Sequence, residues 1–127
     1  MELYLIDTNV VSDYLSASFP PAGIALIDKA VDVTPNISII TQIELLCWQT
    51  DEVTIQNVQE FIDDCVVLNI TSDVILHCIN LRKTKKIKTP DAIIAATALA
   101  YGLTIITNNA KDFANINGLK IVNPHKM

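Results

Sequence analysis

The chain has 127 residues, of which 50% are hydrophobic and 18% are charged. This length and composition predict a single globular domain over residues 1–127 and exclude a chain that stays disordered. Nine basic and fourteen acidic residues give a net charge of −5, which excludes a uniformly basic nucleic-acid-binding surface.

Apolar runs and cysteines bear on the cellular setting. The longest apolar runs are too short to span a membrane, and the N-terminal residues lack the basic start of a signal peptide. Cys47, Cys65 and Cys78 are widely spaced among apolar neighbours and form neither a disulfide framework nor a zinc-binding pattern. We therefore expect a soluble protein of the cytoplasm.

The first part of the chain predicts a strand followed by two helices. Residues 2–7 form an apolar run that ends in Asp7, which is typical of a strand covered on both faces in a parallel sheet. Thr8 or Asn9 is expected to cap a helix that reaches residue 15. After a break over residues 16–22, apolar residues at helical spacing predict a second helix over residues 24–31.

The middle of the chain continues the alternation. Residues 36–40 and 66–68 are expected strands, and residues 54–65 an expected helix. Thr41 and Glu44 have the spacing of a capping box that opens another helix, so Glu44 has a structural explanation as the partner of its own cap. Thr71 is expected to cap a further helix that runs into a basic segment.

The last third holds the most distinctive predicted helix. Thr89 is expected to cap it, with Pro90 in the first position and Gly102 at its left-handed end. Strands over residues 103–107 and 119–122 follow, with a turn or short helix over residues 108–113. Strands alternating with helices predict an α/β domain with a central parallel sheet of four to five strands flanked by helices.

Four acids are candidate site residues because of where they fall on these elements. Asp7 and Asp112 follow predicted strands, Glu44 lies one turn into a helix that follows a strand, and Asp91 lies in the first turn of a helix. Ligands bind at the carboxyl edge of such a sheet, so the acids are expected to converge there. For Asp91 alone, a favourable interaction with the helix dipole is the competing explanation.

Converging carboxylates repel one another, and a hard divalent cation relieves that repulsion. Mg²⁺ or Mn²⁺ suits a site of carboxylate, hydroxyl and amide oxygens without His or Cys. Such ions activate water for attack on a phosphodiester, so the pattern favours a metal-dependent nuclease.

Five of the nine basic residues fall within seven positions directly ahead of Asp91: Arg82, Lys83, Lys85, Lys86 and Lys88. A solvated connection between helices and a phosphate-facing RNA contact are equally good interpretations of this run.

Four segments in order resemble the acidic motifs of PIN-domain nucleases, and most closely those of the VapC-type toxins of prokaryotic toxin–antitoxin pairs. The segments are residues 5–9 (LIDTN), 38–45 (SIITQIEL), 90–98 (PDAIIAATA) and 106–113 (ITNNAKDF). The resemblance covers most of the chain, and its first and third motifs are the most specific.

The resemblance implies a Mg²⁺- or Mn²⁺-dependent endoribonuclease with catalytic and metal-binding residues Asp7, Glu44, Asp91 and Asp112. It also implies that Asn9 and Thr107 orient ligands or water, that the protein forms homodimers, and that an antitoxin protein binds it. Family members often carry an acid where this chain has Asn109, so either Asp112 or Asn109 fills the fourth position.

Two other functions compete with that of a nuclease. Aspartyl-phosphate chemistry on Asp7 would need a second acid at position 9 or adjacent acids near the N-terminus, and the chain has neither. A catalytically silent PIN-like module that binds RNA or protein is the alternative to an enzyme. The retained acids disfavour it, because a surface that only binds a polyanion has little use for them.

Overall fold

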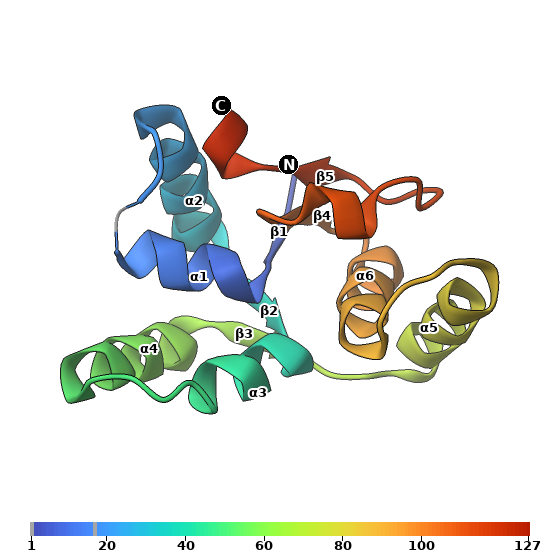
Figure 1. Ribbon diagram of the computed structural model, residues 1–127, viewed down its shortest axis with the longest axis horizontal. Helices are drawn as coiled ribbons and strands as arrows, with labels where there is room; N and C mark the ends of the chain where they lie inside the picture. The colour runs from blue at the N-terminus through green and yellow to red at the C-terminus, as the bar shows by residue number, and fades with distance from the viewer. Residues whose placement is uncertain (1, 17) are drawn as a thin grey trace.

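Five short parallel strands form the centre of the fold, in the order β3-β2-β1-β4-β5 (Figure 1). The strands are β1 (Tyr4–Ile6), β2 (Asn36–Ser38), β3 (Val66–Leu68), β4 (Thr104–Ile106) and β5 (Ile121–Val122). The predicted α/β fold with a parallel sheet flanked by helices is confirmed, although each strand except β3 is shorter than predicted.

Helices connect and cover these strands. They are α1 (Thr8–Leu15), α2 (Pro21–Val33), α3 (Ile39–Leu46), α4 (Glu52–Asp64), α5 (Ser72–Thr84) and α6 (Thr89–Tyr101), with the short 3₁₀ helices η1 (Ala110–Phe113) and η2 (Pro124–Lys126). The computed structural model describes residues 2–16 and 18–127. Met1, at the start of the N-terminal stretch considered above, and position 17, in the predicted break, lie outside the described residues.

Two hydrophobic clusters lie on opposite faces of the sheet. Leu5 and Ile105 point to the face covered by α5 and α6, where the alanines of α6 allow close packing. Ile6 and Ile106, one residue further along the same strands, point to the face covered by α1, α2, α3 and α4. Because successive strand residues alternate between faces, the two central strands β1 and β4 contribute to both cores and are buried along their whole length.

The N-caps of three helices differ from the prediction, and α2 and α4 begin two to three residues earlier than expected, at Pro21 and Glu52. Asp7 caps α1 in place of Thr8 or Asn9, and Ser38 caps α3, so the capping box expected at Thr41 is wrong. The N-cap of α6 is Lys88, which moves Thr89 into the first helical position. Gly102 ends α6 in the left-handed conformation (φ 69°), as predicted.

The direction in which successive strands are added to the sheet reverses between β1 and β4. From β1 the chain builds outward through β2 and β3, whereas β4 and β5 extend the sheet on the other side. The two central strands pair in register, Leu5 opposite Ile105 and Ile6 opposite Ile106. Their carboxyl ends, at Asp7 and Thr107, therefore flank the position where open α/β sheets bind ligands.

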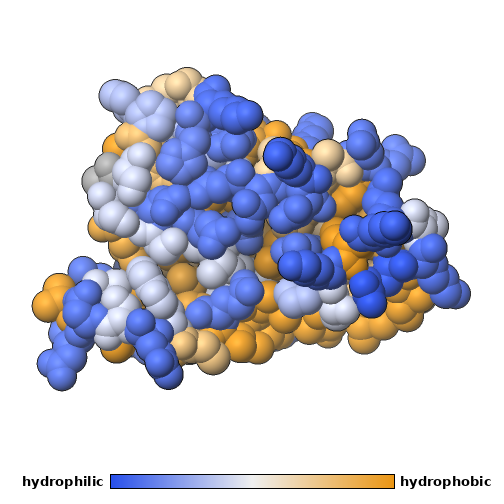
Figure 2. Space-filling model, in the orientation of Figure 1, coloured by the Kyte–Doolittle hydropathy of each residue, from blue (hydrophilic) through white to orange (hydrophobic). Residues whose placement is uncertain are grey.

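The surface combines a polar face with exposed apolar side chains. Figure 2 shows hydrophilic atoms over much of the face in view and apolar atoms gathered along its lower edge. Among the described residues, no helix has the length and apolar character needed to cross a membrane.

Candidate active site

Asp7 is the most firmly fixed of the four acids. It follows β1, its backbone N–H donates to the carbonyl of Ile106 (3.0 Å), and only 5% of its surface is exposed. Its Oδ1 accepts from the backbone N–H of Thr8 (2.8 Å) and its Oδ2 accepts from Oγ1 of Thr107 (2.8 Å). The carboxylate is thus held from two sides, by the start of α1 and by the residue that follows the neighbouring strand β4.

Glu44 is held by a residue of another helix. It lies on the exposed side of α3, where its Oε1 accepts from Oγ1 of Thr8 (2.6 Å). The same Thr8 oxygen lies 3.1 Å from Oγ1 of the fully buried Thr41. The competing explanation of Glu44 as a cap partner is wrong, because its partner is on α1 and α3 begins at Ser38.

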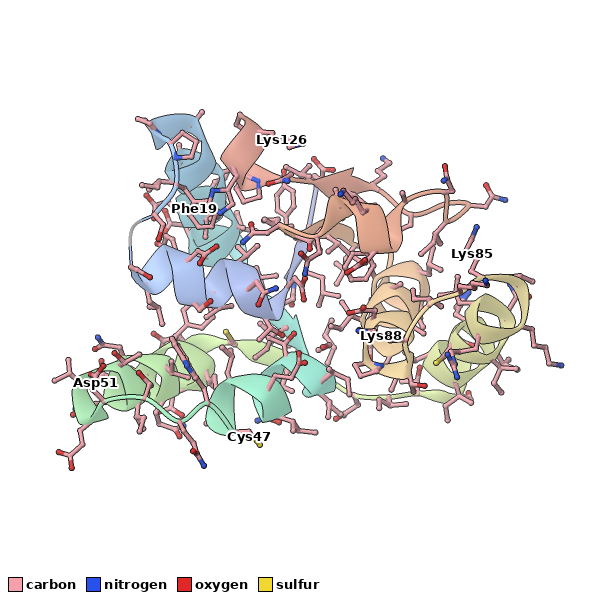
Figure 3. The ribbon with its side chains drawn as sticks, in the orientation of Figure 1. Phe19, Cys47, Asp51, Lys85, Lys88 and Lys126 are labelled. Atoms are coloured by element: carbon pink, nitrogen blue, oxygen red, sulfur yellow. The ribbon has the colours of Figure 1, made fainter. Side chains whose placement is uncertain are left out.

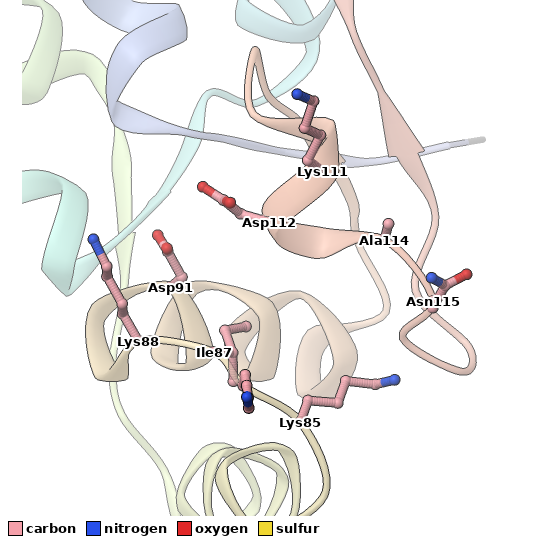
Figure 4. A pocket seen from close by; sticks show the side chains of 9 residues that line it. Lys85, Ile87, Lys88, Asp91, Lys111, Asp112, Ala114 and Asn115 are labelled. Carbon is pink, nitrogen blue, oxygen red and sulfur yellow. The ribbon is translucent and has the colours of Figure 1, made fainter.

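Asp91 and Asp112 reach the same space from the other side. Asp91 lies in the first turn of α6 and is half-buried, whereas Asp112 lies on η1 and is exposed. Their carboxyl groups extend into the same space, with Lys88 beside Asp91 (Figure 4). The helix-dipole explanation therefore does not account for all the surroundings of Asp91.

The four acids line one cavity of about 300 Å³, which we call the acid pocket. Its lining residues are Asp7, Thr8, Asn9, Glu44, Lys88, Pro90, Asp91, Asn109 and Asp112. Asn9 and Asn109 thus share the pocket with the acids, and Thr107 lies behind it as the partner of Asp7. The predicted convergence is present, and the catalytic and ligand roles of these residues stay predictions.

The electrostatics of the pocket follow from burial and crowding. Burial raises the pKa of the Asp7 carboxyl, the hydrogen bonds from Thr107 and Thr8 oppose that rise, and the charges of Asp91 and Glu44 add to it. Burial also raises the pKa of Asp91, and Asp112 and Glu44 raise it further, against the lowering effect of Lys88. The carboxylates therefore destabilise one another's ionised forms, as groups that gather around a cation do.

The donor set fits a hard divalent cation. Carboxylate, hydroxyl and amide oxygens line the acid pocket together with one lysine. In the described part of the chain no three His, Cys, Asp or Glu side chains already converge closely enough to hold an ion together. Mg²⁺ usually takes one or two carboxylates and completes its octahedron with waters, so the more open arrangement is compatible with it.

A second cavity, of about 380 Å³, adjoins the acid pocket, and we call it the basic hollow. It shares Lys88, Asp91 and Asp112 with the acid pocket and adds Lys85, Lys86 and Lys111. In Figure 3, Lys85 and Lys88 both lie along the segment that joins α5 to α6. The predicted basic run thus divides, with three of its lysines beside the acids.

The other two residues of the basic run lie on α5. Arg82 donates from a guanidinium nitrogen to the carbonyl of Ile87 (2.6 Å), which ties the end of α5 to the segment before α6. Lys83 is exposed on the last turn of that helix. The contact to Ile87 favours a structural role for Arg82, whereas Lys85, Lys86 and Lys88 line the basic hollow.

Sequence reasoning missed two residues of the site. The hydroxyl of Thr8 is the partner of Glu44, although the sequence suggested only a capping role for it. Lys111 lines the basic hollow from η1, outside the run of basic residues. The nearest signals were their positions directly beside Asp7 and Asp112.

Three comparisons with known proteins bear on this arrangement. The sequence model of the PIN domain family matches residues 4–119. No curated protein matches the chain. A toxin-antitoxin complex from Klebsiella pneumoniae contains a similar chain, with 32% identity and a TM-score of 0.74 over 98% of this chain and 99% of that one.

Two further solved structures are similar. DNA-bound VapBC from Salmonella typhimurium matches with 26% identity and a TM-score of 0.75, over 96% of this chain and 98% of that one. VapBC2 from Rickettsia felis, bound to a DNA fragment from its promoter, matches with 22% identity and a TM-score of 0.78, over 95% of this chain and 98% of that one. With the family match over most of its length, the chain belongs to the PIN domain family, and its resemblance to VapC-type members is confirmed.

Proposed function

We propose that this protein is a metal-dependent endoribonuclease and the toxin of a toxin–antitoxin pair, with residues 1–127 acting as one nuclease domain. The observation that carries the proposal is the acid pocket. Four carboxylates from four separate segments of the chain line one cavity beside the reversal point of the sheet. Burial and mutual repulsion raise the pKa of two of them, which is typical of functional sites.

The proposed metal ligands and catalytic residues are Asp7, Glu44, Asp91 and Asp112, with Mg²⁺ or Mn²⁺ as the cation. When bound, the cation would supply an activated water and neutralise charge that develops on the phosphodiester. Hydrogen bonds from Thr107 and Thr8 orient Asp7, and the Thr8 hydroxyl orients Glu44. Thr8 therefore links two of the proposed ligands, and Lys88 offsets part of the negative charge at Asp91.

Partners and location form part of the same proposal. The similar solved structures from Klebsiella pneumoniae and Salmonella typhimurium are a toxin-antitoxin complex and a VapBC complex, which supports an antitoxin partner. Exposed Ile75, Leu76 and Ile79 on α5 offer an apolar face for a homodimer, which light scattering in solution tests. The free cysteines suit the reducing cytoplasm, where RNA is available.

The test of the enzymatic function is Asp91→Asn with Asp73→Asn as its matched control. Both acids lie in the first turn of a 13-residue helix, so both changes remove the same dipole interaction, but only Asp91 lines the acid pocket. Cleavage of single-stranded RNA with Mg²⁺, Mn²⁺ or a chelator is measured for each protein. We expect Asp91→Asn to lose about 100-fold or more of the metal-stimulated rate, while Asp73→Asn retains it.

Equal cleavage by wild type and Asp91→Asn contradicts the proposal. A wild type that binds RNA but does not cut it with either cation supports the catalytically silent module instead. Sequencing the ends of RNA fragments released on expression then identifies the target RNA and the cleavage site.

A further inference from the structure

The acid pocket lies between two other hollows. On one side it shares Lys88, Asp91 and Asp112 with the basic hollow. On the other side it shares Thr8, Asn9 and Glu44 with a cavity of about 530 Å³, which we call the Trp48 hollow. The three cavities form a continuous row from the α5–α6 connection, across the acids, to the end of α3. In Figure 3, Lys85 and Cys47 mark the two ends of this row.

The Trp48 hollow combines an aromatic ring with hydrogen-bonding groups. Trp48 follows the end of α3 and is 40% exposed. Asn9 and Ser12 line the hollow from α1, and Leu45 and Cys47 add apolar surface beside the ring. An aromatic ring beside amide and hydroxyl groups is the chemistry that proteins use to stack an unpaired nucleobase and bond its edge.

Trp48 lines a second, smaller cavity as well as the hollow. Trp48 also borders a small apolar cleft with Leu46, Ile55 and Val58, between α3 and α4. Its backbone N–H donates to the carbonyl of Leu45 (3.3 Å). Trp48 therefore lies between the α4 cleft and the hollow, and its exposed part is accessible to a base.

The two ends of the row differ in the part of a nucleotide that they suit. The basic hollow presents four lysines, which attract the phosphates of a nucleic acid whatever its base sequence. The Trp48 hollow contains no lysine or arginine and presents an aromatic surface instead. A polymer that alternates phosphates with planar bases matches both ends at once, which favours an RNA strand over a protein segment as the occupant.

We propose that the Trp48 hollow binds an unpaired nucleobase of the RNA strand whose neighbouring phosphodiester lies in the acid pocket, with the base stacked on Trp48 and the strand continuing into the basic hollow. This inference rests on the proposed function, because it takes the acid pocket as the place where RNA is cut. It makes Trp48 a substrate-binding residue that selects single-stranded RNA and positions it next to the acids.

Trp48 is the single tryptophan of the chain, so its fluorescence reports on this hollow alone. The Asp91→Asn protein with Mg²⁺ is titrated with penta-adenylate, and binding is followed separately by the anisotropy of an end-labelled oligomer. We expect saturable quenching of Trp48 emission over the concentrations at which anisotropy rises. An oligomer of five abasic ribose phosphates is the control, and it is expected to bind without quenching.

Variants test the contribution of the ring. Trp48→Ala is expected to weaken penta-adenylate binding about tenfold, because stacking on an aromatic side chain contributes on that order per base. Trp48→Phe is expected to stay within about threefold of the parent protein. Leu46→Ala is the matched control, since Leu46 is exposed near the end of α3 and borders the α4 cleft but not the Trp48 hollow. Thermal melting of each variant checks that it folds.

The outcomes separate this inference from the proposed function. A rise in anisotropy without quenching overturns the nucleobase site and leaves the nuclease proposal standing, as does unchanged affinity in folded Trp48→Ala. If Trp48→Ala keeps RNA binding but loses a protein partner, the hollow is a protein-docking site and the inference is wrong. No anisotropy rise with any single-stranded RNA overturns the nuclease proposal and the nucleobase site together.

Discussion

The two walls of the acid pocket are built in different ways. On one wall Asp7 follows the end of β1 and is buried, and hydrogen bonds from Thr107, just past β4, and from the start of α1 fix its carboxylate. On the other wall Asp91 is half-buried on α6 and Asp112 is exposed on the short helix η1. The first wall is positioned by the sheet itself, whereas the second depends on a helix start and a surface turn.

The two walls differ in how firmly each carboxylate is held and in how far burial opposes its negative charge. A carboxylate held by two hydrogen bonds keeps its direction whether or not a cation is present, and its burial makes the negative charge costly. The exposed carboxylate of Asp112 is free to adjust its direction. We infer that the wall formed by Asp7 at the end of β1, which we call the β1 wall, sets where a cation binds, and that Asp112 on η1 adapts to it.

The largest expected effect comes from removing one charge from each wall in turn. We expect Asp7→Asn to lower the metal-stimulated cleavage rate by about 100-fold or more, because the variant keeps the shape of the wall but not its charge. Asp112→Asn is expected to cost about tenfold or less, since water or Asn109 can replace an exposed oxygen. Both rates are measured on the same RNA at saturating Mn²⁺. Equal losses in the two variants contradict the distinction between the walls.

An intermediate effect is expected from loosening Asp7 without changing its charge. Thr107 is fully buried, and its Oγ1 donates to Asp7 while it accepts from the backbone N–H of Asn109 (3.0 Å). Thr107→Val leaves both partners without this oxygen, so we expect about a tenfold lower cleavage rate and a loss of about 1–2 kcal/mol in unfolding free energy.

Thr97→Val is the matched control for that change. Thr97 is also buried, but its hydroxyl donates to the carbonyl of Ile93 within α6, away from the acids. Cleavage assays and chemical denaturation of both variants compare the two sites. If Thr97→Val lowers the cleavage rate as much as Thr107→Val does, the effect comes from general packing and not from the position of Asp7.

The fold was predictable from local patterns, but the starts of its helices were not. Apolar runs separated by helical periodicity sufficed to predict a parallel sheet of four to five strands, and the φ of Gly102 followed from the conformational freedom of glycine. The start of α3 was placed at Thr41, because Thr41 and Glu44 have capping-box spacing. In the structure Ser38 at the strand end caps the helix, and Glu44 bonds Thr8, 36 residues away. Such a distant partner leaves no local signal.

The candidate site was likewise predictable in part: its acids could be predicted from the sequence, but their hydrogen-bond partners could not. The convergence of the four acids at one edge of the sheet was predictable, because parallel strands present their carboxyl ends together. These acids are Asp7, Glu44, Asp91 and Asp112. The bond from Thr107 to Asp7 depends on β4 lying next to β1, and the sequence predicted the strands without their order. The same limit applies to the Trp48 hollow, since it forms only where α1 and the end of α3 lie side by side.

The smallest expected effect is on stability, and it tests the cost of burying charge in the β1 wall. Burial raises the pKa of Asp7 above its ordinary value of 3.8, so the folded protein takes up a proton at a higher pH than the unfolded chain does. The free energy of unfolding contributed by Asp7 therefore increases as the pH falls from about 7 toward 4. Asp7→Asn removes this cost at neutral pH and keeps a group that can bond both Thr8 and Thr107.

Without metal, we accordingly expect Asp7→Asn to be about 1 kcal/mol more stable than wild type at pH 7, or about 3–5 °C higher in Tm. The difference is expected to shrink toward zero near pH 4. Comparing two proteins is necessary because hydrogen bonds lower the pKa of Glu2 and Asp51, which makes their contributions to the wild-type pH profile run the other way. Thermal melts at a series of pH values measure the difference. A variant that is less stable at pH 7, or a difference that does not vary with pH, shows that the two hydrogen bonds outweigh the burial of the charge.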